Sequence, residues 1–254
     1  MIEFSAQYSP ANDALTNKVI VVTGAGDGIG KTAALTFARY GATVVLMGRT
    51  IAKLEQVYDA IESEGNPNTA IYPINFEGAV EKDYVDMANK LDEEYGKIDG
   101  LLINAAILGP HTPMNNYSWD NWQQIMQVNL NSPFMMIQAL TPLLEKSGNG
   151  SVITTSSSVA NKGRAFWGGY SVSKAALKNL TEILAEEWDG TCPIRINSIN
   201  PGGTRTQMRA AAYPAENPAD VPLPEQHMPL YVYLMSDDST GVSGGYFNAR
   251  EYLG

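Results

Sequence analysis

The sequence is organised around residues 18–41, KVIVVTGAGDGIGKTAALTFARYG. The β-branched run KVIVVTG has the continuous apolar character of a strand buried on both faces of a parallel sheet. The run GIGKTAALTFARYG has helical character and ends at Gly41, which suits the position just after a helix. We therefore expect a strand, a glycine-rich turn and a helix in direct succession.

The same alternation continues along the chain. Further strands are expected at residues 42–48, 69–75, 100–104, 151–156 and 194–200. Further helices are expected at residues 51–64, 81–95, 118–144 (with a kink at Pro133) and 169–188. Strands that alternate with helices of this length pair in parallel through right-handed crossovers. We predict an α/β fold, a doubly wound Rossmann-type sandwich with a central parallel sheet of about seven strands and helices on both faces.

The length of 254 residues fits one dinucleotide-binding domain over residues 1–254. Residues 1–17 form a polar leader. Residues 207–227, with four prolines, are too proline-rich for a central element. We expect them to form a mobile flap over the substrate at the sheet edge.

The charge balance limits the possible partners. Lys+Arg 17 against Asp+Glu 27 gives a net charge of -10, which disfavours nucleic acid and anionic membranes. The N-terminal segment has no signal-peptide pattern, and no apolar run is long enough to span a membrane. We expect no nucleic-acid or membrane partner.

Cysteine and histidine are scarce. Cys192 is the only cysteine, so no intramolecular disulfide can form, and we expect a small buried thiol in a reducing cytoplasm. The chain has only two histidines, His111 and His227, so we expect no metal site.

The glycines of TGAGDGIG predict a dinucleotide site. Gly24, Gly28 and Gly30 let the backbone turn sharply, approach a pyrophosphate and pack the helix against the strand. The N-terminus of that helix favours an anion. Ordinary turns also use glycine, but the position between a strand and a helix favours the binding site.

The end of the second strand favours NADP(H) over NAD(H). Gly48 and Arg49 stand where NAD-binding proteins usually carry a carboxylate, and a guanidinium suits a 2′-phosphate. Asp27, inside the glycine loop, counts against this prediction because it could place a negative charge near that phosphate.

Tyr170 and Lys174 predict proton chemistry. A spacing of four brings both side chains onto one face of a helix, where an ammonium can lower the pKa of the phenol. The alternative is an exposed helix pair without function.

The motif set resembles that of the short-chain dehydrogenase/reductase family. TGAGDGIG, NAAI, VNLNSPF, TTSSSVANKGRAFWGGYSVSKAAL and NPGGTRT occur in the family's order, and the match covers residues 18–248. The chain is further similar to the YciK-like bacterial oxidoreductases. The substrates of that group are not established, so this resemblance does not predict a substrate.

The resemblance implies four catalytic residues. Tyr170 would be the general acid/base, and Lys174 would hold the nicotinamide ribose and lower the pKa of the tyrosine. Ser157 would orient the substrate carbonyl, although Ser156 and Ser158 flank it. Asn129 would hold a water through its backbone and relay protons to the lysine.

The resemblance also implies the residues that surround the cofactor. They are Gly24, Asp27, Gly28, Ile29, Gly30, Arg49, Asn75, Phe76, Asn104, Tyr170, Lys174, Pro201, Gly202, Thr204 and Thr206. The family's usual second asparagine and glycine after Asn104 are replaced here by Ala105, Ala106 and Ile107.

We expect an NADP(H)-dependent oxidoreductase that moves a hydride between nicotinamide and a carbonyl or secondary alcohol. The alternatives are an NADP(H)-binding regulatory protein without turnover, and an epimerase or dehydratase, for which a longer C-terminal domain would be usual. The family implies a homodimer or homotetramer. Phe166, Trp167, Met208 and Tyr213 could line an apolar substrate pocket or be core or subunit contacts.

Overall fold

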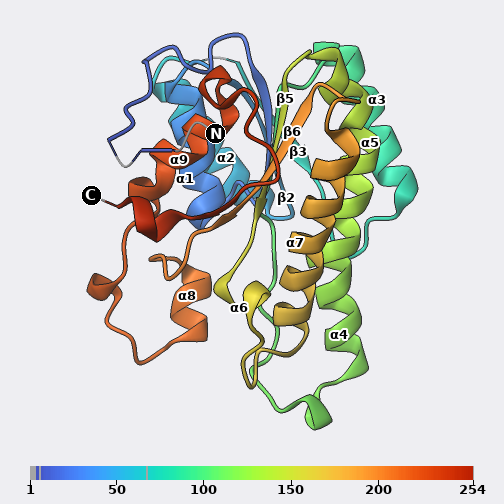
Figure 1. The fold of residues 1–254 in the computed structure, drawn as a ribbon, viewed down its shortest axis with the longest axis vertical. Coiled ribbons are helices and arrows are strands. Elements are labelled where there is room, and N and C mark those ends of the chain that lie inside the picture. The colour runs from blue at the N-terminus through green and yellow to red at the C-terminus, as the bar shows by residue number, and fades with distance from the viewer. Residues whose placement is uncertain (1–3, 6, 67, 254) are drawn as a thin grey trace.

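The protein is described here by a computed structural model that covers residues 4–5, 7–66 and 68–253 (Figure 1). Its centre is one seven-stranded sheet in the order β3-β2-β1-β4-β5-β6-β7, with every neighbouring pair parallel. The strands are β1 Val19–Thr23, β2 Thr43–Gly48, β3 Thr69–Pro73, β4 Gly100–Ile103, β5 Gly150–Thr155, β6 Ile194–Asn200 and β7 Tyr246–Asn248. The predicted Rossmann-type sheet is confirmed.

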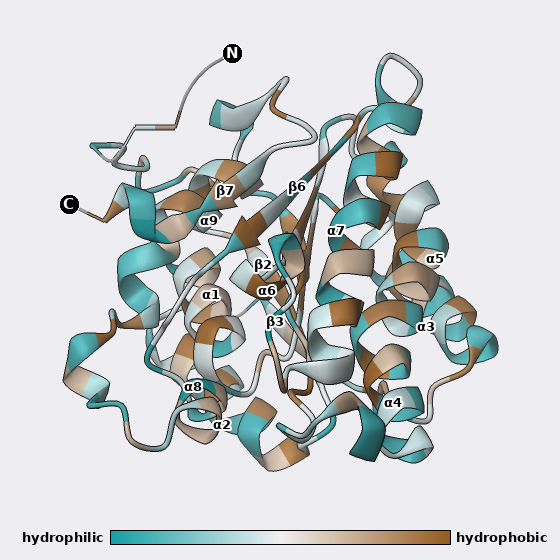
Figure 2. Cartoon of the chain, turned by 60° about the horizontal axis from the view of Figure 1, so that its bottom comes forward, coloured by the Kyte–Doolittle hydropathy of each residue, from teal (hydrophilic) through white to brown (hydrophobic). Residues whose placement is uncertain are grey.

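Helices cover both faces of the sheet (Figure 1). On one face lie α1 (Gly28–Arg39), α2 (Ile51–Ser63) and α9 (Met228–Met235). On the other lie α3 (Glu81–Tyr95), α4 (Trp119–Met126), α5 (Ser132–Lys146) and α7 (Gly168–Trp188). Two short helices, α6 (Ser158–Asn161) and α8 (Gln207–Ala212), lie at the edge that comes forward in Figure 2.

The buried apolar side chains form two clusters, one on each face of the sheet. One contains Phe37 of α1 and Leu234 of α9, and the other contains Met87 of α3 and Leu140 of α5. Strands buried on both faces explain why β1, β2 and β4 read as continuous apolar runs rather than as alternating ones.

The helix expected over residues 118–144 is divided, which corrects the prediction of a kink at Pro133. Between α4 and α5 the chain makes a π-helical turn, Gln127–Asn131. Pro133 lies in the first turn of α5, where its missing N–H costs no helical hydrogen bond. The irregularity centres on Asn129, and π-helical turns are frequent at functional sites.

The polar leader is packed against the sheet domain over its described residues. Phe4 and Leu15 are buried in the cluster that contains α1 and α9. The ring of Tyr8 lies 5.1 Å from that of Tyr233. The segment is polar in composition, but its few apolar side chains complete the core.

The expectation of a buried thiol is wrong. Cys192 follows α7 and is only half-buried. Its thiol donates a hydrogen bond to the Glu145 carboxylate over 3.2 Å, and this bond raises the pKa of the thiol. A raised pKa leaves less thiolate at neutral pH, which argues against a nucleophilic role.

No helix in the described part of the chain is long and apolar enough to cross a bilayer. Among the same residues, no three His, Cys, Asp or Glu side chains come together in a group that could hold a metal ion.

The proline-rich residues after β6 form α8 and two short 3₁₀ helices, Pro218–Asp220 and Pro224–His227. Both 3₁₀ helices begin at a proline, where the fixed φ favours the first helical position. The mobility of residues 207–227 stays a prediction.

Candidate active site

A cleft of about 500 Å³ opens at the carboxyl edge of the sheet. β1 has β2 on one side and β4 on the other, so the strand order reverses there, and ligands of doubly wound sheets bind at this point. All predicted site residues line the cleft except Gly30 and Asn129.

The glycine loop has the backbone that glycine permits. Gly24 and Gly28 have φ values of 67° and 51°, in the left-handed region. A Cβ atom on Gly30 would lie 2.2 Å from the Gly24 carbonyl oxygen, so only glycine lets α1 pack this closely on the loop. Gly30 therefore shapes the site from behind rather than lining it.

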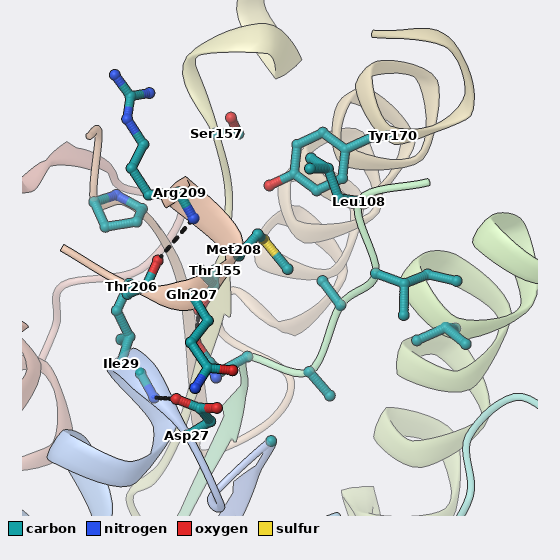
Figure 3. A pocket seen from close by; sticks show the side chains of 18 of the residues that line it. Asp27, Ile29, Leu108, Thr155, Ser157, Tyr170, Thr206, Gln207, Met208 and Arg209 are labelled. Carbon is teal, nitrogen blue, oxygen red and sulfur yellow. Dashed lines mark hydrogen bonds between the residues drawn. The ribbon is translucent and has the colours of Figure 1, made fainter. Parts of the chain in front are cut away.

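Asp27 has two structural partners. One carboxylate oxygen accepts the Gly28 N–H over 2.7 Å and caps α1 (Figure 3). The other lies 2.5 Å from the Lys53 ammonium. Arg49 lies nearby, exposed and 3.6 Å from Glu77. The negative charge of Asp27, which counted against NADP(H), is therefore balanced by Lys53.

Tyr170 and Lys174 lie in the first turns of α7 and are 8% and 2% exposed. The Lys174 ammonium donates a hydrogen bond over 2.7 Å to the carbonyl of Thr155, the last residue of β5. It lies 5.8 Å from the centroid of the Tyr170 ring. The pair is thus buried at the cleft and is not an exposed helix pair.

The pKa of Tyr170 differs from the expectation that Lys174 lowers it. Burial raises the pKa of Tyr170 to about 12, and hydrogen bonding to the Ser157 side chain opposes this only in part. Burial also lowers the pKa of Lys174 to about 8. Desolvation disfavours the charged form of both groups, and it outweighs the attraction that the spacing alone suggested.

The three neighbouring serines have different surroundings. Ser157 lines the cleft, precedes α6 and interacts with Tyr170. The Ser156 hydroxyl lies 3.5 Å from the hydroxyl of Tyr246, and Ser158 is exposed. Among the three, Ser157 has the position expected for a side chain that acts together with Tyr170.

Asn129 is fully buried in the π-helical turn. Its amide bonds both the N–H and the carbonyl of Ile107 over 2.9 Å, and it donates to the Ser173 hydroxyl over 3.1 Å. These bonds fix the loop after β4 and connect it to α7. The side chain therefore positions the walls of the site.

Asn104, Asn75 and Phe76 lie after β4 and β3 at the cleft. The Asn104 side chain donates to the Thr23 carbonyl over 3.3 Å and accepts a hydrogen bond from Thr155 over 3.3 Å. Asn75 is exposed, whereas the Phe76 ring is buried in the core. The Phe76 side chain thus serves packing, although the residue also lines the cleft.

The segment after β6 lies across the cleft from α7. Pro201, Gly202, Thr204 and Thr206 all line the cleft. The Thr204 hydroxyl lies 3.0 Å from Nε2 of buried His227 and donates to the Pro201 carbonyl over 3.1 Å. Thr206 caps α8 by accepting the Arg209 N–H.

The residues present fit a nicotinamide dinucleotide. The close Gly24–Gly30 packing holds the N-terminus of α1 at the cleft, and Gly28, its first residue, lines the cleft without a Cβ atom that would keep a pyrophosphate away. Two cationic side chains, Arg49 and Lys53, line the cleft beside the end of β2, and Lys174 lies at the β5 side.

The sequence reasoning missed several residues of the cleft. Lys53 and Leu108 line it, as does Arg209, and Thr155 supplies the carbonyl that binds Lys174. A lysine in the first turn of the helix after β2 was the available signal for Lys53. No sequence pattern distinguishes the other three.

The fold and the site together define a Rossmann-type oxidoreductase. A family model for short chain dehydrogenases matches residues 18–217. The chain belongs to the short-chain dehydrogenase family.

Similar proteins agree with this assignment. The uncharacterized oxidoreductase YciK of Escherichia coli (strain K12) is 45% identical over 243 residues, 96% of each chain. A solved structure from Escherichia coli CFT073, complexed with NADPH, is 45% identical with a TM-score of 0.92 and covers 95% of this chain and 100% of that one. The 3alpha-hydroxysteroid dehydrogenase of Mediterraneibacter gnavus is 34% identical over 241 residues, 91% of this chain and 94% of that protein. The predicted likeness to YciK is confirmed.

The buried His227 predicts acid sensitivity. Burial, assisted by the positive charge of Arg250, lowers the pKa of His227 to about 4 from an ordinary value of 6.5. Between these values the unfolded chain binds more protons than the native one, so stability falls as pH falls through this window. When the pH falls from 6.5 to 4, the free energy of unfolding of both proteins should fall. We expect this fall to be about 2 kcal/mol smaller in His227→Gln than in the wild type. Urea denaturation at both pH values measures this, and equal losses in the two proteins would contradict it.

Proposed function

We propose that this protein is an NADP(H)-dependent oxidoreductase that interconverts a carbonyl and a secondary alcohol. The observation that carries the proposal is the convergence of Ser157, Tyr170 and Lys174 on one end of a cleft whose other end is the glycine loop. The NADPH complex of a similar protein supports the choice of cofactor.

The bound nicotinamide supplies or accepts the hydride at carbon. The Ser157 and Tyr170 hydroxyls orient the substrate oxygen, and Tyr170 gives it a proton in the direction of reduction. With a pKa of about 12, Tyr170 keeps its proton at neutral pH yet is a stronger acid than an aliphatic alcohol. The geometry therefore suits carbonyl reduction, which converts C=O to CH–OH by adding one hydride and one proton.

Lys174 acts through its position. The hydrogen bond to Thr155 holds the ammonium under the catalytic end of the cleft, where it can bind the nicotinamide ribose. Asn129 positions the loop after β4 and α7 against each other. We propose that its π-helical turn gives access to the proton-relay water implied by the family.

The preference for NADP(H) rests on two cations. Arg49, exposed and 3.6 Å from Glu77, offers donors for a 2′-phosphate at the adenosine end, and Lys53 neutralises Asp27 beside it. Because Lys53 balances Asp27, the carboxylate does not repel that phosphate. The single cysteine fits the cytoplasm, which we propose as the location.

Replacing the proposed acid tests the function. We expect Tyr170→Phe to lower kcat by about 10²- to 10⁴-fold, because the phenol proton is lost. NADPH affinity should change little, since the ring is retained. Oxidation of NADPH with a ketone panel and fluorescence titration of NADPH give the two quantities. Unchanged turnover would exclude Tyr170 as the acid, and NADPH binding without turnover of any ketone by the wild type would favour the regulatory alternative.

A charge reversal tests cofactor preference. We expect Arg49→Asp to lower the ratio of kcat/KM for NADPH over NADH by about tenfold or more, because a charge-assisted bond is replaced by repulsion. Lys82→Asp, on the outer surface of α3, should leave the ratio unchanged. If Arg49→Asp leaves the ratio unchanged, Arg49 does not hold the phosphate.

We also propose that the chain is a homo-oligomer. Exposed apolar side chains lie on two neighbouring helices, Phe134 on α5 and Val172 and Ile183 on α7. Val172 and Ile183 are about three turns apart and so share one face of α7. A second copy would bury this surface, in keeping with the assembly that the family implies.

The oligomer proposal predicts a change in mass. We expect Ile183→Glu to shift the protein toward monomer, because a buried unpaired carboxylate is costly. The control Leu223→Glu, at an exposed leucine outside α5 and α7, should keep the wild-type mass. Light scattering at micromolar concentration measures both. A wild type that is monomeric would contradict the proposal.

A further inference from the structure

The two ends of the cleft differ in chemistry (Figure 3). Asp27, Arg49 and Lys53 lie at the glycine-loop end. Around Tyr170 the lining includes Ser157, Lys174 and Arg209 but is otherwise mostly apolar or aromatic. Its apolar part comes from the loop after β4, the turn before α7, and α8 with the residue after it. These lining residues are Ile107, Leu108, Trp167, Met208, Ala212 and Tyr213.

Trp167 is the centre of this apolar end. Its ring lies 5.8 Å from that of Tyr170 and 5.9 Å from that of Tyr213. On the loop after β4, the His111 ring lies 4.7 Å away. Tilted ring pairs at these separations are favourable. Trp167 is nevertheless only half-buried and lines the cleft, so part of the indole remains available to a ligand.

The backbone around Trp167 is strained. Phe166 has φ 71°, a left-handed conformation that costs a residue with a Cβ about 1–2 kcal/mol. Phe166 is 56% exposed, so its own burial does not offset this cost. Gly168 has φ 37°, and a Cβ atom there would lie 2.2 Å from the Tyr117 ring. Strain of this kind persists where the conformation serves a site, and here it places Trp167 beside Tyr170.

The two cations at this end, Arg209 and Lys174, are held by contacts within the protein. Arg209 makes two bonds to the Glu216 carboxylate, of 2.6 and 2.5 Å, and its guanidinium carbon lies 3.7 Å from the centroid of the Tyr213 ring. The Lys174 ammonium has no carboxylate partner, but it is only 2% exposed, donates to the Thr155 carbonyl and is assigned by the proposed function to the nicotinamide ribose. Among the described residues that line the apolar end, no charge is therefore both exposed and unpaired, as a carboxylate or a phosphate of the substrate would require.

We propose that Trp167 is the specificity-determining residue. The substrate is an uncharged ketone or secondary alcohol that contains a ring, and the flat face of this ring packs on the indole. The proposal rests on the proposed function and names its substrate class. A ring loses little conformational freedom on binding, and its apolar faces match the lining. This packing places the carbonyl or hydroxyl oxygen of the substrate at Ser157 and Tyr170.

The test compares ring and chain ketones. Cyclohexanone and acetophenone are matched with 2-hexanone and 2-octanone, and the charged 4-acetylbenzoate is added. The wild type should have the highest kcat/KM with the uncharged ring ketones. We expect Trp167→Ala to lower kcat/KM for the ring ketones about tenfold or more and for the chain ketones less than about threefold, because only a ring stacks on the indole.

Two further variants control for folding and position. Trp167→Phe should restore most of the preference for ring ketones, since it keeps an aromatic face. Trp119→Ala removes a tryptophan that is 67% exposed on α4 and does not line this cleft, and it should leave all rates unchanged. In Tyr170→Phe, which we expect to bind ligand with little turnover, calorimetry with 1-phenylethanol and NADP⁺ should show binding. Adding Trp167→Ala to that variant should weaken the binding.

The outcomes separate the two proposals. If chain or charged ketones are reduced as well as ring ketones, with rates that depend on Tyr170 but not on Trp167, the function stands and the ring inference is wrong. Equal losses for ring and chain ketones in Trp167→Ala also overturn it. If the wild type reduces no ketone and Tyr170→Phe binds no ring alcohol, the proposed function fails and the ring inference fails with it.

Discussion

The hydrogen bond between the Lys174 ammonium and the Thr155 carbonyl is the contact on which the site depends. It joins α7 to the end of β5, and so fixes Tyr170, one turn earlier on α7, at the carboxyl edge of the sheet. A buried ammonium is costly without such a partner. The same burial that makes the bond necessary also lowers the pKa of Lys174 and raises that of Tyr170. Position and proton affinity at this site therefore have one physical cause.

The elements with strong periodicity could be predicted from the sequence. The bounds of α3, residues 81–95, and of β6, residues 194–200, agree with the structure, because amphipathic helices and short strands rich in β-branched residues are local signals. The parallel pairing of the strands followed from the alternation of strands and helices. The glycine loop was also predictable, since the conformations of Gly24 and Gly28 require residues without a Cβ atom.

The features that sequence reasoning missed depend on contacts between distant segments. The π-helical turn forms where Asn129 bonds Ile107, a residue 22 positions away. Lys53 faces Asp27 only because α2 packs on the glycine loop. The pKa of Tyr170 was predicted in the wrong direction because spacing shows a neighbouring charge but does not show burial. Cys192 was expected to be buried because free cysteines usually are. The turn after α7 nevertheless leaves it half-exposed.

The polarity of the cleft connects the fold to its chemistry. The glycine-loop end combines a helix N-terminus with Arg49 and Lys53, which suits phosphates. The opposite end pairs its charges internally and exposes rings and methyl groups, which suits an apolar ligand. Tyr170 lies between the two ends. Its pKa is raised because the phenol is buried, as at the apolar end. An apolar ligand that covers the Tyr170 hydroxyl would exclude water, and this would strengthen the local electrostatic interactions on which proton donation depends. Under the proposed function, the same apolar lining would select the ligand and keep the phenol protonated until a carbonyl oxygen is in place.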